Sequence, residues 1–263
     1  MEKLCPLLFD EQGNYKTPKT YTSLFNKPLK SCLFYMNLFF AIYKGSKIAK
    51  KGLYTHEQWQ NTSLYVFNYL EKLGIEFDIS GVNSFKRLEG PCVFVGNHMS
   101  TLETAVLPVI IDPIKKVTFV VKESLINYPI FKHIMRATNP ITVSRTNPRE
   151  DLKKILQEGN ERLKSGISIV VFPQTTRSLI FDPNQFNSIG VKLAKNSGVP
   201  IVPLAIKSDA WANGKIIKDF GRLDISKKVY FAFGEPLYIK GRGNDEHKIL
   251  IDFIQKKLNI WSD

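Results

Sequence analysis

The chain has 263 residues, of which 43% are hydrophobic, so it is long and apolar enough to bury a core and is not a disordered tail. Its formal net charge of +13 indicates an anionic partner: nucleic acid, an anionic membrane surface or a phosphorylated substrate. The three cysteines, Cys5, Cys32 and Cys92, have no paired spacing, which is typical of a reducing compartment and gives no zinc-binding pattern.

The first 30 residues show little hydrophobic periodicity, and we expect an irregular arm there. They begin Met1-Glu2-Lys3 and lack the long apolar stretch and small-residue cleavage site of a secretory signal peptide. An apolar, aromatic block then runs from Ser31 to Tyr43, and it is followed by Lys44, Lys47, Lys50 and Lys51. As a helix this block would span ~20 Å against a hydrocarbon core of ~30 Å, so we do not expect it to cross a bilayer.

Two interpretations of this block stay open. Aromatic residues beside lysines are typical of a helix that lies in the interface of an anionic membrane, here expected on the cytoplasmic face. The alternative is a helix packed on the domain core.

A second helix is expected to begin after Thr55, which forms a capping-box pattern with Gln58, and to end at Gly74. Residues 1–74 are therefore expected to form an arm and two helices ahead of a main domain of residues 75–263.

In the main domain, short apolar runs alternate with amphipathic stretches. The apolar runs predict strands at Ile75–Ile79, Cys92–Val95, Val117–Val121, Ile141–Val143, Ile167–Phe172, Ile201–Ile206 and Val229–Phe233. Helices are predicted from Asn147, a suitable N-cap, to Gly166, from Ser188 to Ser197, and from Asp245 to Leu258. This alternation is typical of an α/β fold with an open, mainly parallel sheet covered by helices on both faces. Such sheets bind ligands at the carboxyl ends of their strands.

The most informative segment is residues 96–103, Gly-Asn-His-Met-Ser-Thr-Leu-Glu, which follows a predicted strand. An imidazole beside a carboxylate can take a proton from a weak nucleophile near neutral pH. His98 and Glu103 cannot meet within one regular helix, but they can meet if Ser100 caps a helix whose first turn holds Glu103. The alternative is that Glu103 only completes that cap. The sequence has no Gly-x-Ser-x-Gly elbow, so the expected nucleophile is a substrate hydroxyl.

A second polar segment, Phe172 to Ser178, also follows a predicted strand. Thr175 and Thr176 offer hydroxyl groups and Arg177 offers a planar bidentate donor, and this set suits a phosphate. Because both segments leave carboxyl ends of strands, one crevice could hold His98 and Arg177 together. The alternative for Arg177 is an ordinary salt bridge in a surface loop.

Two further cations, Lys122 and Arg145, follow predicted strands and could add positive charge to the same crevice, or could be solvated side chains. A nucleic-acid partner is not expected, although the net charge alone would allow one. The aromatic residues lie largely in predicted strands and helix faces, they are not interleaved with arginines on a platform, and no RNA- or DNA-binding motif is present.

Four blocks of the chain resemble the motifs of the glycerolipid acyltransferase family, which includes the bacterial 1-acylglycerol-3-phosphate acyltransferases. The family motifs are Asn-His followed after four residues by an acid, a Lys-Glu pair leading to an arginine, a Phe-Pro-Glu-Gly-Thr-Arg-Ser type and a Val-Pro-Ile-Val-Pro type. The matching blocks are, in order, Asn97 to Glu103, Lys122-Glu123 with Arg145, Phe172 to Ser178 and Val199 to Pro203. The resemblance covers roughly residues 75–240, with the blocks in the expected order and spacing.

This resemblance implies a function for each block. His98 would be the general base towards the acceptor hydroxyl, with Glu103 orienting it, and the alkoxide would attack an acyl thioester carried by coenzyme A or acyl carrier protein. Arg177, with Lys122 and Arg145, would hold the acceptor phosphate. The other residues expected to contact substrate are Gln174, Thr175, Thr176 and, near the acyl donor, Pro200. No metal or tightly held cofactor is implied, and the two N-terminal helices resemble the family's membrane-docking pair.

The acceptor implied by the resemblance is lysophosphatidic acid, and the product is phosphatidic acid, an intermediate of phospholipid biosynthesis. Two departures bear on this expectation. Glu103 stands where the family usually has aspartate, and Gln174-Thr175 stands where it has Glu-Gly. The second departure removes a negative charge and a flexible residue beside Arg177. The alternatives are therefore the same chemistry on glycerol-3-phosphate or a lyso-aminolipid, and a non-catalytic protein that binds anionic membranes.

Overall fold

The computed structural model describes residues 7–18, 27–129, 131–174, 176–215 and 217–262. In this part of the chain eight strands form one sheet in the order β1-β2-β8-β7-β3-β6-β4-β5. The strands are β1 Tyr15–Lys16, β2 Phe77–Ser80, β3 Val93–Gly96, β4 Val117–Lys122, β5 Ile141–Val143, β6 Ser168–Val171, β7 Ile201–Lys207 and β8 Val229–Phe233. Neighbouring strands are parallel except in the pairs β1–β2 and β7–β8. The predicted mainly parallel sheet is confirmed.

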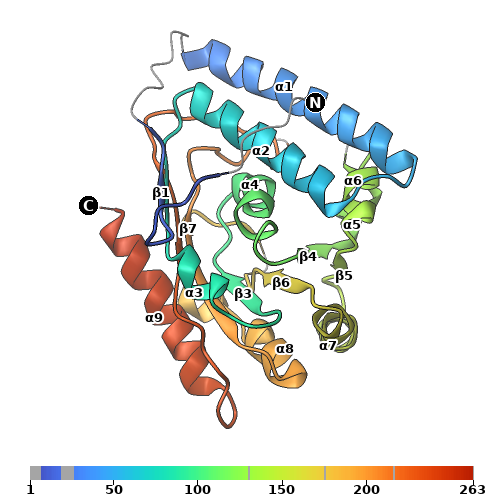
Figure 1. Cartoon of the computed structure of the whole chain (residues 1–263), viewed down its shortest axis with the longest axis vertical. Coiled ribbons are helices and arrows are strands. Elements are labelled where there is room, and N and C mark those ends of the chain that lie inside the picture. The colour runs from blue at the N-terminus through green and yellow to red at the C-terminus, as the bar shows by residue number, and fades with distance from the viewer. Residues whose placement is uncertain (1–6, 19–26, 130, 175, 216, 263) are drawn as a thin grey trace.

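Helices cover both faces of the sheet (Figure 1). One face carries α1 Lys27–Lys50, α2 His56–Lys72, α3 Val82–Lys86 and α4 Leu102–Ile111, and the other carries α7 Pro148–Lys164, α8 Ile189–Ser197 and α9 Asn244–Ile260. Each face of the sheet has its own hydrophobic core. Because successive side chains of β3 point to opposite faces, Phe94 packs with the first set of helices while Val93 and Val95 pack with the second. The helices α5 Glu123–Asn127 and α6 Lys132–Ala137 and the 3-10 turn Pro183–Gln185 complete the fold.

The helix ends follow from local side-chain chemistry. The Thr55 hydroxyl accepts from the backbone N–H of Gln58, and Asn147 accepts from that of Glu150, each at 3.4 Å. Gly198 ends α8 with a φ of +65°, a left-handed conformation that glycine adopts without strain. These three predicted ends are confirmed. The predicted strands lie within two residues of the observed bounds.

The N-terminal segment differs from the expected irregular arm. Tyr15 and Lys16 form β1, an antiparallel edge strand on β2, and α1 extends beyond both ends of the predicted block Ser31 to Tyr43. The described helices include none with the length and apolar character needed to cross a membrane. The inner side of α1 packs on the core through residues such as Phe34, as the second interpretation of the block predicted.

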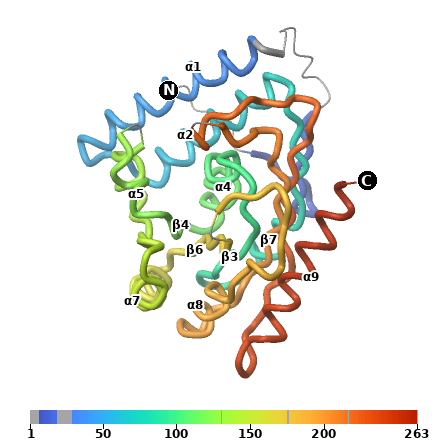
Figure 2. The backbone as a smooth tube through the Cα atoms, turned by 180° about the vertical axis from the view of Figure 1, so that it is seen from behind, coloured from blue at the N-terminus to red at the C-terminus, as the bar shows by residue number. Residues whose placement is uncertain are grey.

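The outer side of α1 keeps large apolar side chains exposed. Met36 is 63% exposed, Phe40 49% and Tyr43 58%. These positions recur at helical spacing and so share one side of α1. Lys44 and Lys47 lie over the rings of Phe40 and Tyr43, at 4.3 and 4.8 Å from the ring centroids. α1 therefore has one side packed on the core and one exposed apolar side, and it lies beside α2 (Figures 1 and 2).

The strand register brings three loops to one edge of the sheet. Val93 of β3 lies opposite Ile169 of β6 and Ile201 of β7, and all three strands run in the same direction. Their carboxyl ends therefore meet at the same edge, where residues 97–101, 172–178 and 208–223 leave the sheet. This is the edge where open parallel sheets bind ligands.

Candidate active site

The loops that follow β3 and β6 lie against each other. The loop after β3 carries His98, and the loop after β6 carries Arg177. The backbone N–H of Ser178 donates to the carbonyl oxygen of His98 at 2.9 Å, and the backbone N–H of His98 donates to Oε1 of Gln174 at 2.7 Å. These two hydrogen bonds fix the positions of the loops relative to each other.

The chain runs very close to β7 just before His98. A Cβ atom on Gly96 would lie 2.7 Å from the carbonyl oxygen of Leu204, so glycine is the residue that fits. The buried side chain of Asn97 donates to the carbonyl oxygen of Ile206 and accepts from its N–H, both at 2.8 Å. Asn97 thus continues the pairing with β7 beyond the strand, and this fixes the direction in which His98 leaves the sheet.

His98 and Glu103 form a pair at the start of α4. Nδ1 of His98 lies 2.8 Å from Oε1 of Glu103, whose side chain has no solvent exposure. The imidazole stacks on the ring of Phe172, with the ring centroids 4.5 Å apart and an interplanar angle of 6°. When Nδ1–H donates to the carboxylate, Nε2 carries the lone pair, which is the arrangement that a general base needs.

The carboxylate of Glu103 is held by several donors besides His98. The backbone N–H of Met99 donates to Oε1 at 2.7 Å and that of Ser100 at 2.9 Å, and the hydroxyl of Ser208 donates to Oε2. Burial alone would raise the pKa of Glu103, but His98 and then Ser208 and Ser100 outweigh it and hold the pKa below its usual value. The carboxylate therefore stays charged and can stabilise a protonated imidazole.

The turn before α4 differs in one detail from the predicted cap. Thr101, not Ser100, is the N-cap residue, and its side chain makes no capping bond. The Ser100 hydroxyl accepts from the backbone N–H of Leu102 at 3.1 Å and also donates to Glu103 at 3.0 Å. The same carboxylate of Glu103 accepts from the backbone N–H of Ser100 and contacts His98, so the contact with the turn and the contact with the imidazole occur together.

Arg177 is held by two side chains from different segments. Its Nη1 donates to the hydroxyl of Thr101, and its Nη2 lies 2.8 Å from Oδ1 of Asp219. Arg145 lies nearby with a left-handed backbone, φ +63°, and its backbone N–H donates to Asp151 at 2.7 Å. Burial lowers the pKa of Arg145, and the charge of Arg177 lowers it further. Two guanidinium groups held this close favour an anion between or beside them.

One cavity of about 540 Å³ contains His98 and Arg177 in its lining, as predicted. The other polar side chains in the lining include Lys122, Arg145, Thr176, Lys218 and Asp219. The apolar lining includes Leu38 and Ile42 of α1, Trp59 and Val66 of α2, Phe119, Leu125, Phe131, Ile134 and Trp211. The cavity lies within the size range of small-molecule sites, and it joins a cationic polar region to an apolar one.

A family model described as Acyltransferase matches residues 76–207, which is half of the 263-residue chain and includes His98, Glu103 and Arg177. The chain belongs to the acyltransferase family. The fold is similar to that in the crystal structure of the 1-acyl-sn-glycerophosphate (LPA) acyltransferase from Thermotoga maritima, with a TM-score of 0.68 at 20% identity, covering 89% of this chain and 95% of that chain.

Curated relatives are similar over a shorter stretch. The 1-acyl-sn-glycerol-3-phosphate acyltransferase of Pseudomonas aeruginosa is 33% identical over 132 residues, 50% of this chain and 49% of that protein. The probable 1-acyl-sn-glycerol-3-phosphate acyltransferase of Mycoplasma genitalium is 32% identical over 119 residues, 44% of each protein. The chain thus spans about half the length of the curated relatives it matches.

The structure does not bring every residue of the acyltransferase motifs to the cavity. Gln174 is 6% exposed and accepts from the backbone of His98, so it holds a loop and is not part of the lining. Pro200 lies at the opposite edge of the sheet, where its carbonyl oxygen accepts from the N–H of Val93 at the start of β3. The substrate contacts predicted for Gln174 and Pro200 are therefore not supported by this arrangement. Thr175 lies outside the described residues.

Two groups of the cavity were not anticipated from the sequence. Lys218 and Asp219 lie in the loop between β7 and β8, and Ser208 begins that connection. No motif marks residues 208–223. The only available signal was topological, because any loop that follows the carboxyl end of β7 reaches the same edge as His98.

Among the described residues, no group of three or more His, Cys, Asp or Glu is arranged to hold a metal ion.

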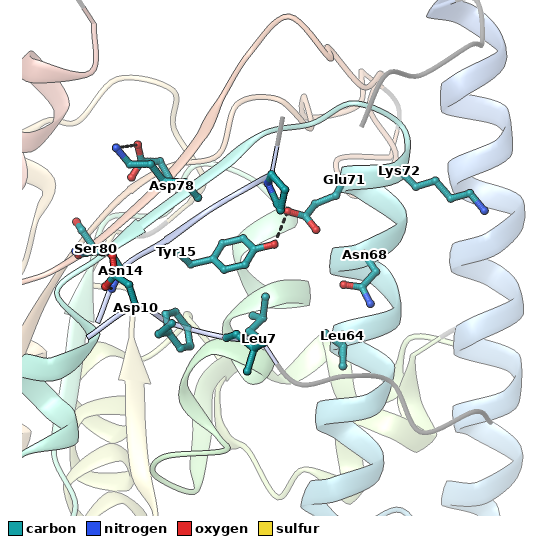
Figure 3. A pocket seen from close by; sticks show the side chains of 14 residues that line it. Leu7, Asp10, Asn14, Tyr15, Leu64, Asn68, Glu71, Lys72, Asp78 and Ser80 are labelled. Carbon is teal, nitrogen blue, oxygen red and sulfur yellow. Dashed lines mark hydrogen bonds and ion pairs between the residues drawn. The ribbon is translucent and has the colours of Figure 1, made fainter. Parts of the chain in front are cut away.

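A second, open pocket of about 1130 Å³ lies between the N-terminal arm, α2 and β2 (Figure 3). Its lining contains neither His98 nor Arg177. Glu71 of α2 is 2% exposed there and accepts from the hydroxyls of Tyr15, at 2.8 Å, and Thr17. Burial raises the pKa of Glu71, and the two hydroxyls only partly oppose it. Glu71 therefore anchors the arm to α2.

Proposed function

We propose that the protein transfers a fatty acyl group from acyl-CoA or acyl-ACP to the free hydroxyl of 1-acyl-sn-glycerol-3-phosphate, giving phosphatidic acid. The observation that carries this proposal is the shared cavity of the His98–Glu103 pair and Arg177. A base, an anion-binding group and an apolar region in one cavity match the hydroxyl, the phosphate and the acyl chain of such an acceptor. The names of the relatives support the same substrate class.

In the proposed mechanism His98 acts as a general base. Nε2 takes the proton from the acceptor hydroxyl, and the oxygen attacks the thioester carbonyl carbon. A C–O bond forms, and the C–S bond then breaks and releases the thiolate, which takes the proton back from the imidazolium. Glu103 stabilises the imidazolium in between, because its carboxylate is charged and 2.8 Å from Nδ1. The donor brings an activated thioester, so we propose no metal or tightly held cofactor.

The acceptor phosphate is proposed to bind Arg177 with help from Lys122, Arg145 and Lys218. All four side chains line the cavity, and Asp219 supplies one opposing charge. An excess of cations suits a phosphomonoester, which carries up to two negative charges near neutral pH. Since Gln174 is outside the lining, the replacement of the family's glutamate by this residue does not alter the charge of the described side chains that line the cavity. This favours lysophosphatidic acid over the lyso-aminolipid alternative.

The outer side of α1 is proposed to lie in the interface of an anionic membrane on the cytoplasmic face. Met36, Phe40 and Tyr43 are exposed, and lysines flank them. The inner side of α1 contributes to the cavity lining, so a lipid acceptor held in the bilayer would have a short path to His98. Co-sedimentation should show binding to vesicles that contain phosphatidylglycerol, and a Phe40→Ser variant that binds them as well as the parent would contradict this placement.

The test of the function is an acyl-transfer assay with one labelled acyl thioester and a panel of acceptors. We expect turnover with lysophosphatidic acid and much less with glycerol-3-phosphate, a lyso-aminolipid or monoacylglycerol. Arg177→Ala should raise the KM for lysophosphatidic acid roughly 10- to 100-fold, the loss expected for hydrogen bonds to a charged group. Arg162→Ala is the matched control, because the Arg162 side chain is equally exposed, at 15%, and pairs with Glu158 outside the cavity.

Failure of the parent protein to use any acceptor would overturn the enzymatic function and favour the non-catalytic membrane-binding alternative. Turnover that is fastest with an acceptor other than lysophosphatidic acid would keep the chemistry and replace the substrate. An equal loss of activity in Arg177→Ala with phosphate-bearing and phosphate-free acceptors would show that Arg177 does not bind the phosphate.

A further inference from the structure

The connection between β7 and β8 (Figure 2) includes a loop described at residues 212–215 and 217–222. Asp219 of this loop is the acid that holds Arg177. Oδ1 of Asp219 lies 2.8 Å from Nη2 of Arg177 and 3.3 Å from the hydroxyl of Thr101, which itself accepts from Nη1. The side chains of Asp219 and Arg177 are 19% and 15% exposed, so the ion pair is largely shielded from solvent. A guanidinium has five N–H donors, and these contacts use two, which leaves donors for an anion.

Backbone contacts hold the two ends of this loop together. The N–H of Ala212 donates to the carbonyl oxygen of Arg222 at 3.1 Å, which closes the loop at its base. A Cβ atom on Gly221 would lie 1.7 Å from the carbonyl oxygen of Ala212, so the two loop ends approach each other as closely as glycine allows. The side chain of Asn213 donates to the carbonyl oxygen of Met99 at 2.9 Å, and the loop thereby also touches the residue that follows His98.

The opposite side of the loop is fixed by α1. The hydroxyl of Tyr35 donates to the carbonyl oxygen of Gly221, and the Ser31 hydroxyl accepts from the backbone N–H of Leu223 at 3.1 Å. Phe220, the neighbour of Asp219, contacts the rings of Tyr35 and Phe39, with centroids 5.5 and 5.4 Å apart. Burial raises the pKa of Tyr35 to about 12, so its hydroxyl stays a donor at neutral pH.

We propose that Asp219 is a positioning residue for Arg177, and that α1 fixes Asp219 through the contacts of Tyr35 and Phe220 with the loop. This inference rests on the proposed function, in which Arg177 binds the acceptor phosphate. Asp219 acts through Arg177: it holds the guanidinium in place before the phosphate arrives, and this lowers the entropy lost on binding. The helix with the exposed apolar side is thus linked to Arg177 through the loop that carries Asp219.

The first test compares Asp219→Asn with Asp78→Asn in steady-state transfer to lysophosphatidic acid. Asp78 is the matched control, because its side chain is 21% exposed and pairs with Lys16 and Lys228 outside the cavity. Asp219→Asn should raise the KM for lysophosphatidic acid about ten-fold, the effect of one charge-assisted hydrogen bond, with kcat little changed. The KM for phosphate-free monoacylglycerol and the melting temperature should not move, whereas a merely structural defect would change both.

Three results would overturn the inference. An unchanged KM would show that Asp219 does not position Arg177, and a lowered KM would show that its carboxylate competes with the phosphate. An equal rise in KM for monoacylglycerol would show a general defect. If the parent protein does not acylate lysophosphatidic acid at all, the proposed function fails and this inference falls with it, so the two failures are distinguishable.

The second test addresses the contact with α1. Tyr35→Phe removes the hydroxyl that donates to the loop, and Tyr238→Phe is the control, because Tyr238 is 63% exposed and lies outside the cavity. Tyr35→Phe should raise the KM for lysophosphatidic acid less than Asp219→Asn does, and the double variant should show less than the product of the two effects, because both act on Arg177. Two results would overturn the link to α1. One is a KM for the double variant that rises by the full product of the two single effects, and the other is a KM for Tyr35→Phe equal to that of the parent.

Discussion

Glu71 and Glu103 are buried glutamates, each beside one of the two pockets described above, and the pKa values of their carboxyl groups shift in opposite directions. Glu71 accepts from the hydroxyls of Tyr15 and Thr17, but burial outweighs these hydrogen bonds and raises its pKa. Glu103 is buried more completely, yet its pKa is lowered, because an imidazole and backbone N–H groups face it. Burial sets the cost of a charge, and the type of partner decides whether the carboxyl group stays ionised.

This contrast separates a structural acid from one suited to catalysis. Glu71, whose pKa is raised, anchors the N-terminal arm through hydrogen bonds to hydroxyls and has no cationic partner among the side chains that donate to it. The ionised Glu103 can stabilise a positive charge on His98, and it lies at the edge of the sheet where Arg177 and the cavity are. The two sites therefore predict different responses to the same isosteric substitution.

The largest expected difference is in turnover. Glu103→Gln removes the charge opposite His98 and should lower kcat for lysophosphatidic acid by about 10²-fold or more, the usual contribution of an oriented base. Glu71→Gln should leave kcat unchanged, because Glu71 lies outside the catalytic cavity. Both variants need a measured melting temperature, so that kcat refers to folded protein. Similar kcat values for the two variants would remove the distinction between the sites.

A smaller effect is expected from the hydroxyl groups that donate to each carboxylate. Ser208→Ala removes one donor to Glu103 and should lower kcat about ten-fold, in line with one hydrogen bond to a charged group. Thr17→Val removes a donor to Glu71 and should affect stability but not kcat. A Ser208→Ala enzyme with parental kcat would show that the charge of Glu103 does not depend on this donor.

The distance along the sequence between two contacting residues explains which contacts the sequence could predict. His98 and Glu103 are five residues apart, and the turn that joins them is visible as a capping pattern. The contact between Arg177 and Asp219 spans 42 residues, and no local pattern connects the two loops. The helix ends at Asn147 and Gly198 were predictable for the same reason as the first pair, because each depends on neighbours along the chain.

Features that depend on residues distant in the sequence, or that were assigned from a motif alone, were not predicted correctly in position. β1 contains two residues, and its existence depends on pairing with β2 more than sixty residues away, so it has no periodicity of its own. Pro200 was assigned to the substrate from the motif alone. Its position just before a predicted strand already placed it at the amino edge of the sheet, away from the cavity that contains His98.

The smallest expected difference is in how stability depends on pH. The folded-state pKa of Glu103 is below the usual value of 4.5, so its contribution is present above that value and is lost as the pH falls through the lowered pKa. The folded-state pKa of Glu71 is above 4.5, so its contribution is present below that value and is lost as the pH rises through the raised pKa.

Urea unfolding from about pH 3.5 to pH 6 measures these two contributions. As the pH falls, the unfolding free energy of Glu103→Gln should decrease less than that of the parent. As the pH rises above about 4.5, the unfolding free energy of Glu71→Gln should decrease less than that of the parent. Shifts of the same sign in both variants would show that the two carboxyl groups do not differ in the way their partners imply.

The most direct test of the account is the turnover of purified, folded His98→Ala protein at saturating lysophosphatidic acid, together with the affinity of the variant for that lipid. The account predicts that kcat falls at least about 10²-fold, because the base is removed, while binding is largely retained through Arg177. A His98→Ala protein that transfers the acyl group as fast as the parent would contradict the central role of His98.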